Sequence, residues 1–194
     1  LESKTIARPD ILQRCSEKVD TGELYAELNE RGLSYGPYFQ TIQQLQRGHN
    51  EVLAHIRLHA GLSAENPDYF LHPTLLDGCF QSLIAATSEK SHFYMPVSIR
   101  RINYHAKPGN AVWCHGKLNL LNEHSIEGEL TLFDEHGHVL VEVTGLRCRA
   151  LANEKNNPGG QLAQWTYAWQ WQKKAAPSSV KRKGCWLVFS TASE

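Results

Sequence analysis

The sequence has no long apolar stretch and no excess of charge of either sign. No run approaches the roughly 18 apolar residues of a membrane-spanning helix, and the opening Leu-Glu-Ser-Lys is not a signal peptide. The 20 basic residues equal the 20 acidic ones in number, and no basic stripe is present. These absences argue against a membrane protein and against a nucleic acid or an anionic membrane as ligand.

Cysteine patterns typical of disulfide frameworks or zinc sites are also missing. The five cysteines are widely spaced and include no Cys-x-x-Cys pair. A scattered, odd-numbered set indicates reduced thiols in a cytoplasmic protein. His136 and His138 flank Gly137 in a predicted turn, but no third ligand is near them in the sequence. We therefore predict no metal site.

Composition divides the chain into four parts. The chain begins with Leu rather than Met, which indicates a piece of a longer polypeptide, and the polar residues 1–20 are predicted to lead in from a preceding domain. Residues 21–150 can form one domain with a sizeable core. Residues 151–163 predict a linker. Residues 164–194 carry alternating aromatic residues, which suit strands whose tryptophans pack rather than form a ligand cage.

One long helix and several strands are predicted within 21–150. Thr21 is a candidate N-cap for a helix that ends near Arg31, and a hairpin is predicted across 48–50. Apolar residues at helical spacing predict a central helix over 73–88. Strand-like runs separated by turn signals follow at 93–105, 111–121, 125–134 and 138–150. Long strands around one buried helix indicate an α+β domain.

A carboxylate stands near the start of the central helix. The helix opens with the run His72-Pro73-Thr74-Leu75-Leu76-Asp77-Gly78-Cys79-Phe80-Gln81. Pro73 suits a first turn, and Asp77 and Gln81, four residues apart, share a helix face. One interpretation is that Asp77 only charges the helix N-terminus, where the dipole favours an anion. The other is that Asp77 is a catalytic acid whose pKa is raised by burial. Residue types alone leave both open.

Two further motifs accompany this run in a fixed order. Upstream lies Leu33-Ser34-Tyr35-Gly36-Pro37-Tyr38-Phe39-Gln40, and downstream lies Phe93-Tyr94-Met95-Pro96-Val97-Ser98-Ile99. Over about residues 10 to 150, the three motifs together resemble the dehydratase domains of modular polyketide synthases. Residues 164–194 are similar to the start of a ketoreductase structural region, cut short after one or two strands.

The resemblance implies a hotdog fold, an antiparallel sheet wrapped around a long helix. Dehydratases of this family are double hotdogs with the active site between their halves. The first half carries a His-x-x-x-Gly-x-x-x-x-Pro motif whose histidine is the catalytic base. None of the ten histidines here has both Gly four residues on and Pro nine residues on. The resemblance therefore implies the C-terminal hotdog alone.

The resemblance also assigns residues to the site. Asp77 would donate a proton to the departing hydroxyl, Gln81 would bind the carboxyl group or the substrate hydroxyl, and the Tyr35 phenol would reach the same carboxyl group. His72, five residues before Asp77, is expected to be structural rather than the base. Loop and pocket positions are expected at Gly36, Pro37, Phe39, His72, Pro73 and Pro96.

The implied reaction removes water from a β-hydroxyacyl chain on the phosphopantetheine arm of an acyl carrier protein. The product is an α,β-enoyl thioester, and the domain itself binds no cofactor. An N-terminal hotdog would supply the base, so we expect this chain alone to be inactive. Neighbouring synthase domains and a second copy of the chain are further expected partners. Two alternatives stay open: a non-catalytic docking hotdog, or a hotdog thioesterase, isomerase or cyclase.

Overall fold

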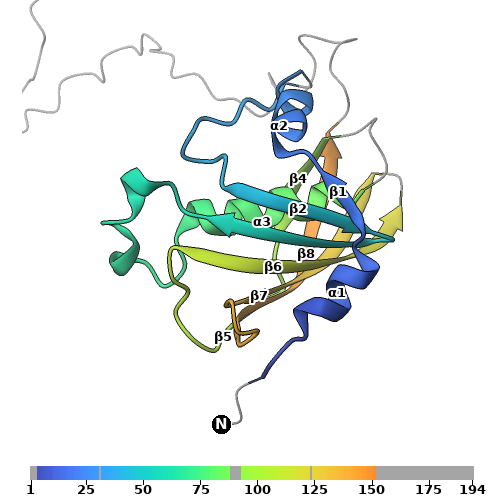
Figure 1. The fold of residues 1–194 in the computed structure, drawn as a ribbon. Helices are drawn as coiled ribbons and strands as arrows, with labels where there is room; N and C mark the ends of the chain where they lie inside the picture. Colours follow the sequence, from blue (N-terminus) through green and yellow to red (C-terminus); the bar gives the residue numbers. More distant parts are fainter. Residues whose placement is uncertain (1–3, 31, 88–92, 123, 152–194) are drawn as a thin grey trace, which may run out of the picture. The chain divides into compact units, whose positions relative to one another are not determined.

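A single antiparallel sheet forms the frame of the domain (Figure 1). The computed structural model describes residues 4–30, 32–87, 93–122 and 124–151. The strands are β1 (Glu17–Val19), β2 (Ile42–Gly48), β3 (Glu51–Arg57), β4 (Phe93–Ser98), β5 (Arg101–Tyr104), β6 (Ala111–Asn122), β7 (Ser125–Phe133) and β8 (Val139–Leu151). The helices are α1 (Arg8–Arg14), α2 (Thr21–Glu30) and α3 (Pro73–Ala85), with 3-10 turns η1 (Ala60–Leu62) and η2 (Asn66–Asp68). Strand order is β1-β2-β3-β6-β7-β8-β4, and β5 also pairs with β8.

Most of the predicted strands are confirmed, but one of them is divided. The hairpin across 48–50 joins β2 to β3, with Asn50 at a positive φ of 53°. The predicted strand over 93–105 is wrong as a single element, because it forms β4 and β5. Gly145 of β8 lies opposite the division at a φ of 64°, and its carbonyl accepts a hydrogen bond from the Arg100 backbone N–H at 3.2 Å. This left-handed glycine marks where the pairing of β8 passes from β4 to β5.

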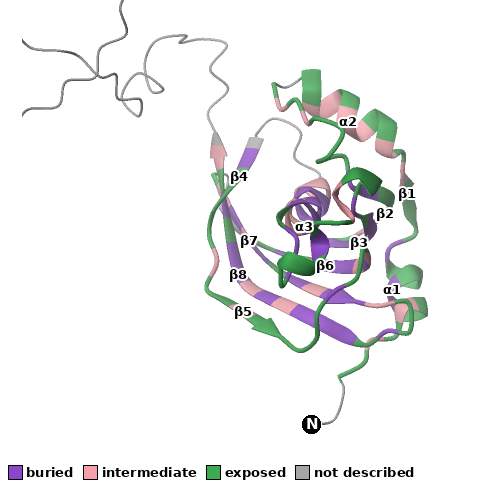
Figure 2. Cartoon of the chain, turned by 90° about the vertical axis from the view of Figure 1, so that its left-hand side faces the viewer, coloured by how far each residue is buried: buried purple, intermediate pink, exposed green. Residues whose placement is uncertain are grey.

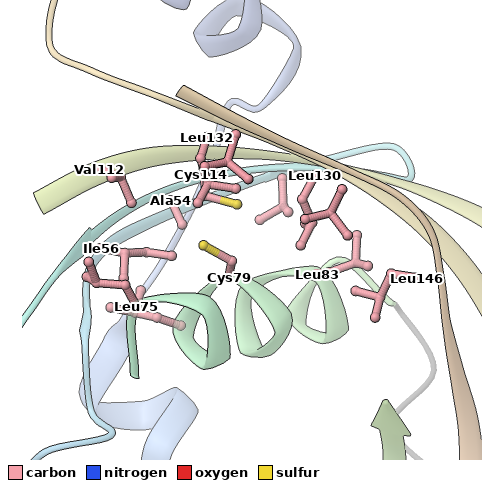
Figure 3. Packing of buried hydrophobic residues seen from close by; sticks show 14 of the residues in the cluster. Ala54, Ile56, Leu75, Cys79, Leu83, Val112, Cys114, Leu130, Leu132 and Leu146 are labelled. Atoms are coloured by element: carbon pink, nitrogen blue, oxygen red, sulfur yellow. The ribbon is translucent and has the colours of Figure 1, made fainter. Parts of the chain in front are cut away.

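Helix α3 lies against the concave face of the sheet (Figure 2). Leu75, Cys79 and Leu83 recur at helical spacing, are fully buried and point at the sheet (Figure 3), as the apolar periodicity predicts. Opposite Leu83 the sheet carries glycines. A Cβ at Gly128 would lie 2.4 Å from Leu83 Cδ2, and one at Gly116 would lie 3.1 Å from Leu83 Cδ1. The absence of side chains there allows α3 to approach the strands closely.

Helix α1 covers the opposite face of the sheet (Figure 2). Ile11 and Cys15 pack with Leu53 of β3 and Phe133 of β7 in a second buried cluster. Strand β1 pairs with β2 at the edge of the same sheet. This corrects the expectation that residues 1–20 only lead into the domain, because residues 8–14 and 17–19 contribute a helix and a strand to it. Both faces of β3 are buried as a result.

A buried carboxylate ties α1 to the sheet. Glu51 accepts hydrogen bonds from the Arg14 guanidinium, with Nε–Oε2 at 2.7 Å and Nη2–Oε1 at 3.0 Å. His115 Nε2 of β6 lies 2.8 Å from Glu51 Oε1. The hydrogen bonds from Arg14 lower the pKa of Glu51, and burial lowers the pKa of His115. Both groups bind protons less readily in the folded than in the unfolded chain. Lowering the pH therefore destabilises the folded chain through each group.

The lowered pKa of Glu51 gives a pH-dependent prediction. Its contribution to stability is fully present above the ordinary pKa of 4.5 and is lost as the pH falls through the folded-state pKa. We expect the free energy of unfolding of Glu51→Gln to be lower at neutral pH and to decrease less steeply between about pH 5 and pH 3. Urea denaturation followed by circular dichroism measures both effects. Glu65→Gln, at an exposed carboxylate, is the control, and an unchanged acid slope in Glu51→Gln would contradict the assignment.

Two predicted segments cannot be compared with the structure. The linker at 151–163, apart from residue 151 at the end of β8, and the aromatic strands at 164–194 lie outside the described residues. Among the helices that are described, none has the length and apolarity to cross a bilayer, and the longest, α3, has 13 residues.

Candidate active site

The Asp77 side chain lies at a cleft beside α3. The cleft has a volume of about 470 Å³ and is lined by the loop at 32–39, by α3 and by β4. Six of the nine predicted site positions line it, namely Tyr35, Gly36, Phe39, Asp77, Gln81 and Pro96. The other three, Pro37, His72 and Pro73, are not part of the lining. The three sequence motifs therefore meet at one place in the fold.

Asp77 is the fifth residue of α3, because the helix begins at Pro73. The interpretation of Asp77 as a charge at the helix N-terminus requires it to lie in the first turn, but no acidic residue occupies that turn. The dipole effect falls off within the first turn, which removes the support for Asp77 as a mere helix-end charge. His72 caps the helix instead, with its Nδ1 accepting a hydrogen bond from the Thr74 backbone N–H at 3.3 Å. This agrees with a structural role for His72.

Gln81 is 4% exposed, and both protons of its amide are used. Nε2 donates to Asp77 Oδ2 at 2.6 Å and to the Phe39 carbonyl oxygen at 3.1 Å. Oε1 accepts a hydrogen bond from the Tyr25 hydroxyl at 3.0 Å. No N–H group remains for a substrate. Of the two roles predicted for Gln81, the geometry favours orienting Asp77.

The surroundings of Asp77 suit a carboxyl group that holds a proton. Burial raises the pKa of Asp77 above its ordinary value, and the hydrogen bond from Gln81 opposes part of that rise. The cleft lining is apolar around it, including Leu33, Phe80 and Ile84. A carboxyl group with a raised pKa is protonated more often near neutral pH and can act as an acid.

The tyrosine hydrogen-bonded to this network is Tyr25 of α2, which the motifs did not indicate. Within the described residues no hydrogen bond joins the Tyr35 phenol to Asp77, although both residues line the cleft, so the predicted contact stays a prediction. The Tyr35 ring stands edge-on to Tyr25 at a centroid distance of 6.2 Å, and burial followed by the nearby Asp77 charge raises the pKa of Tyr35. One signal could have indicated Tyr25, since a tyrosine on the apolar face of a predicted helix needs a partner for its hydroxyl.

His136 and His138 lie in a turn that the Asp134 carboxylate holds. Asp134 Oδ1 accepts hydrogen bonds from the backbone N–H groups of His136 and His138, both at 2.9 Å. His138 Nδ1 lies 2.9 Å from Asp134 Oδ2. Over the described ranges, no three His, Cys, Asp or Glu side chains come close enough to hold a metal ion.

The family model described as the polyketide synthase dehydratase N-terminal domain matches residues 3–158. The chain belongs to the polyketide synthase dehydratase family. Among curated relatives of this chain, the phthioceranic/hydroxyphthioceranic acid synthase of Mycobacterium tuberculosis is 27% identical over 180 residues, which cover 89% of this chain and 8% of the synthase. A mycocerosic acid synthase-like polyketide synthase of the same species is 27% identical over 190 residues, covering 94% of this chain and 9% of that protein. The chain thus spans less than a tenth of these multidomain relatives.

Solved dehydratase domains confirm the α+β hotdog fold. The dehydratase domain from the CurF module of the curacin polyketide synthase is 30% identical, with a TM-score of 0.73, and the match covers 78% of this chain and 54% of that domain. The dehydratase domain of a mycocerosic acid synthase-like polyketide synthase is 26% identical, with a TM-score of 0.70, over 80% of this chain and 57% of that domain. This chain therefore spans little more than half of a solved dehydratase domain.

Proposed function

We propose that this chain is the half of a polyketide synthase dehydratase that carries the catalytic acid, Asp77. The supporting observation is a partly buried carboxyl group with a raised pKa, oriented by Gln81 and facing an apolar cleft. The substrate is a β-hydroxyacyl chain on the phosphopantetheine arm of an acyl carrier protein. The product is the α,β-enoyl thioester.

The reaction needs an acid and a base. Elimination breaks a C–H bond at the α-carbon and a C–O bond at the β-carbon, and the C–H electron pair forms the new double bond. Protonated Asp77 gives its proton to the departing hydroxyl, which leaves as water. The cleft lining contains no histidine among the described residues, so the base comes from a second hotdog. On this proposal the chain is inactive by itself.

Two observations bear on which half this chain is. The matching family model is described as an N-terminal domain, whereas the Asp77 and Gln81 pattern and the missing His-x-x-x-Gly-x-x-x-x-Pro motif favour the C-terminal hotdog. In this proposal the chain is the C-terminal hotdog, because the chemistry depends on these residues. Coverage of 54–57% of solved dehydratase domains is compatible with one half of two.

The curacin structures support a division of acid and base. Two variants of the CurK dehydratase, one with histidine replaced by phenylalanine and one with aspartate replaced by asparagine, are both described as inactive. That enzyme therefore depends on a histidine and an aspartate. In our proposal Asp77 is the corresponding aspartate, and the histidine lies in the N-terminal hotdog of the parent dehydratase. The acyl carrier protein and the neighbouring synthase domains are its other partners in the cytoplasm.

Product analysis distinguishes this function from the other hotdog reactions. The chain, the separately produced N-terminal hotdog and their mixture are each incubated with a β-hydroxyacyl thioester, and products are identified by mass spectrometry and ultraviolet absorbance. We expect a loss of water and a conjugated enoyl thioester in the mixture alone. Free acid would instead indicate a thioesterase, and a shifted double bond or an oxygen ring would indicate an isomerase or cyclase. No product from halves that bind each other would favour a docking role.

A further inference from the structure

We infer that Tyr25 is a positioning residue of this site, acting on the Asp77 carboxyl group through the Gln81 amide. The Tyr25 hydroxyl lies between β2 and α3, where it accepts a hydrogen bond from the Ile42 backbone N–H at 3.3 Å and donates to Gln81 Oε1 at 3.0 Å. The inference rests on the proposed function for its catalytic meaning, but not for its geometry. It gives α2 a role in the active site.

The direction of each hydrogen bond follows from the chemistry of the groups. The Ile42 N–H can only donate, so the Tyr25 oxygen accepts there and its own proton points elsewhere. Burial raises the pKa of Tyr25 to about 12, so the hydroxyl keeps that proton at neutral pH. The proton is directed at Gln81, which fixes the carbonyl end of the amide toward α2.

The other end of the amide is fixed by acceptors. The Phe39 carbonyl can only accept, and Asp77 Oδ2 accepts whenever the carboxyl group is ionised. A flipped Gln81 would place its carbonyl oxygen against both of these acceptors and its N–H groups against the Tyr25 hydroxyl. With Tyr25 present only one orientation satisfies the Tyr25 hydroxyl, the Phe39 carbonyl and Asp77 Oδ2 together, and this orientation holds Asp77 Oδ2 in place.

Loss of the Tyr25 hydroxyl removes the hydrogen bond that holds the carbonyl end of the Gln81 amide. Tyr35 cannot replace it, because within the described residues the Tyr35 hydroxyl makes no hydrogen bond to Gln81 and only its ring contacts Tyr25, at a centroid distance of 6.2 Å. In Tyr25→Phe the aromatic ring on α2 keeps its packing, but the Gln81 side chain can rotate away from Asp77. The carboxylate then loses the hydrogen bond that keeps its pKa from rising further.

The pKa of Asp77 is therefore the readout, measured by carbon-detected NMR titration of the 194-residue chain with labelled aspartate. The Asp77 signal is assigned by its absence in Asp77→Asn. We expect Tyr25→Phe to raise the pKa of Asp77 by roughly 0.5 to 1 pH unit. The control Tyr104→Phe, at a tyrosine 45% exposed on β5, should leave it unchanged.

A double-mutant comparison separates positioning from packing. In the background of Gln81→Ala, Tyr25→Phe should have no further effect on the pKa of Asp77, because the connecting amide is gone. An unchanged pKa in Tyr25→Phe alone, or an equal change in both backgrounds, would overturn the inference. The titration needs neither substrate nor partner, so its failure is distinguishable from a failure of the proposed dehydration. Circular dichroism of each variant verifies that the fold is kept.

Discussion

Replacing Asp77 by Asn is expected to abolish enoyl formation by the reconstituted dehydratase. The amide is nearly isosteric and can still accept a hydrogen bond from Gln81, but it has no acidic proton to give to the departing hydroxyl. Loss of a general acid typically costs about 10²- to 10⁴-fold in rate. We expect a decrease of at least roughly 100-fold in kcat, with little change in KM, because Asp77 acts mainly in the transition state.

The matched control for this variant is Asp68→Asn, at an exposed aspartate on η2. It removes the same charge from a position outside the cleft lining and should retain the wild-type rate. Product formation is followed by the ultraviolet absorbance of the enoyl thioester in the presence of the N-terminal hotdog. Retention of more than a tenth of the rate in Asp77→Asn, with the halves still bound, would show that Asp77 is not the acid.

Replacing Gly78 by Ala is expected to lower the free energy of unfolding by about 1–2 kcal/mol. A Cβ at Gly78 would lie 2.2 Å from Thr41 Oγ1 and 2.9 Å from Ile56 Cγ2, both in the packed interface between α3 and the sheet. Overpacking of this kind costs about 1–3 kcal/mol, and the better helix propensity of alanine offsets up to about 1 kcal/mol of that. Because Gly78 follows Asp77 directly, the same strain should also displace the carboxyl group.

A compensating substitution tests the cause of the effect. Thr41→Ala removes the nearest atom, so Gly78→Ala should cost less in the Thr41→Ala background than in the wild type. Gly109→Ala is the control, since no atom lies within 4 Å of its added Cβ. Urea denaturation gives the free energies. Equal costs of Gly78→Ala in both backgrounds would mean that the clash with Thr41 is not what destabilises the protein.

Local sequence patterns were sufficient to predict the central helix, which buries one apolar face, and the long strands. The central helix was predictable because Leu75, Cys79 and Leu83 recur at helical spacing, and the long strands because turn residues separate them. The cleft was predictable only through the three motifs, which the fold brings together from the loop at 32–39, α3 and β4. No periodic pattern in the sequence indicates that these three segments lie close together in the fold.

The features that were missed depend on contacts between distant segments. Residues 1–20 are mainly polar, and only a few side chains, such as Ile11, are buried by the back of the sheet, so composition gave no sign of α1. The division between β4 and β5 follows from the pairing with β8 at Gly145. Tyr25 was visible as a helical residue, but its connection to Gln81 crosses 56 positions of sequence.

The central proposal is that the active site is shared between this chain and an N-terminal hotdog. The most direct test measures the rate of enoyl formation while the concentration of the N-terminal hotdog is increased at a fixed amount of this chain. The predicted rate is zero without the partner, rises as the partner is added, and saturates at the concentration at which binding saturates in a parallel titration. A rate that is already present without the partner, or that does not follow binding, would contradict the proposal that Asp77 completes a site shared between two hotdogs.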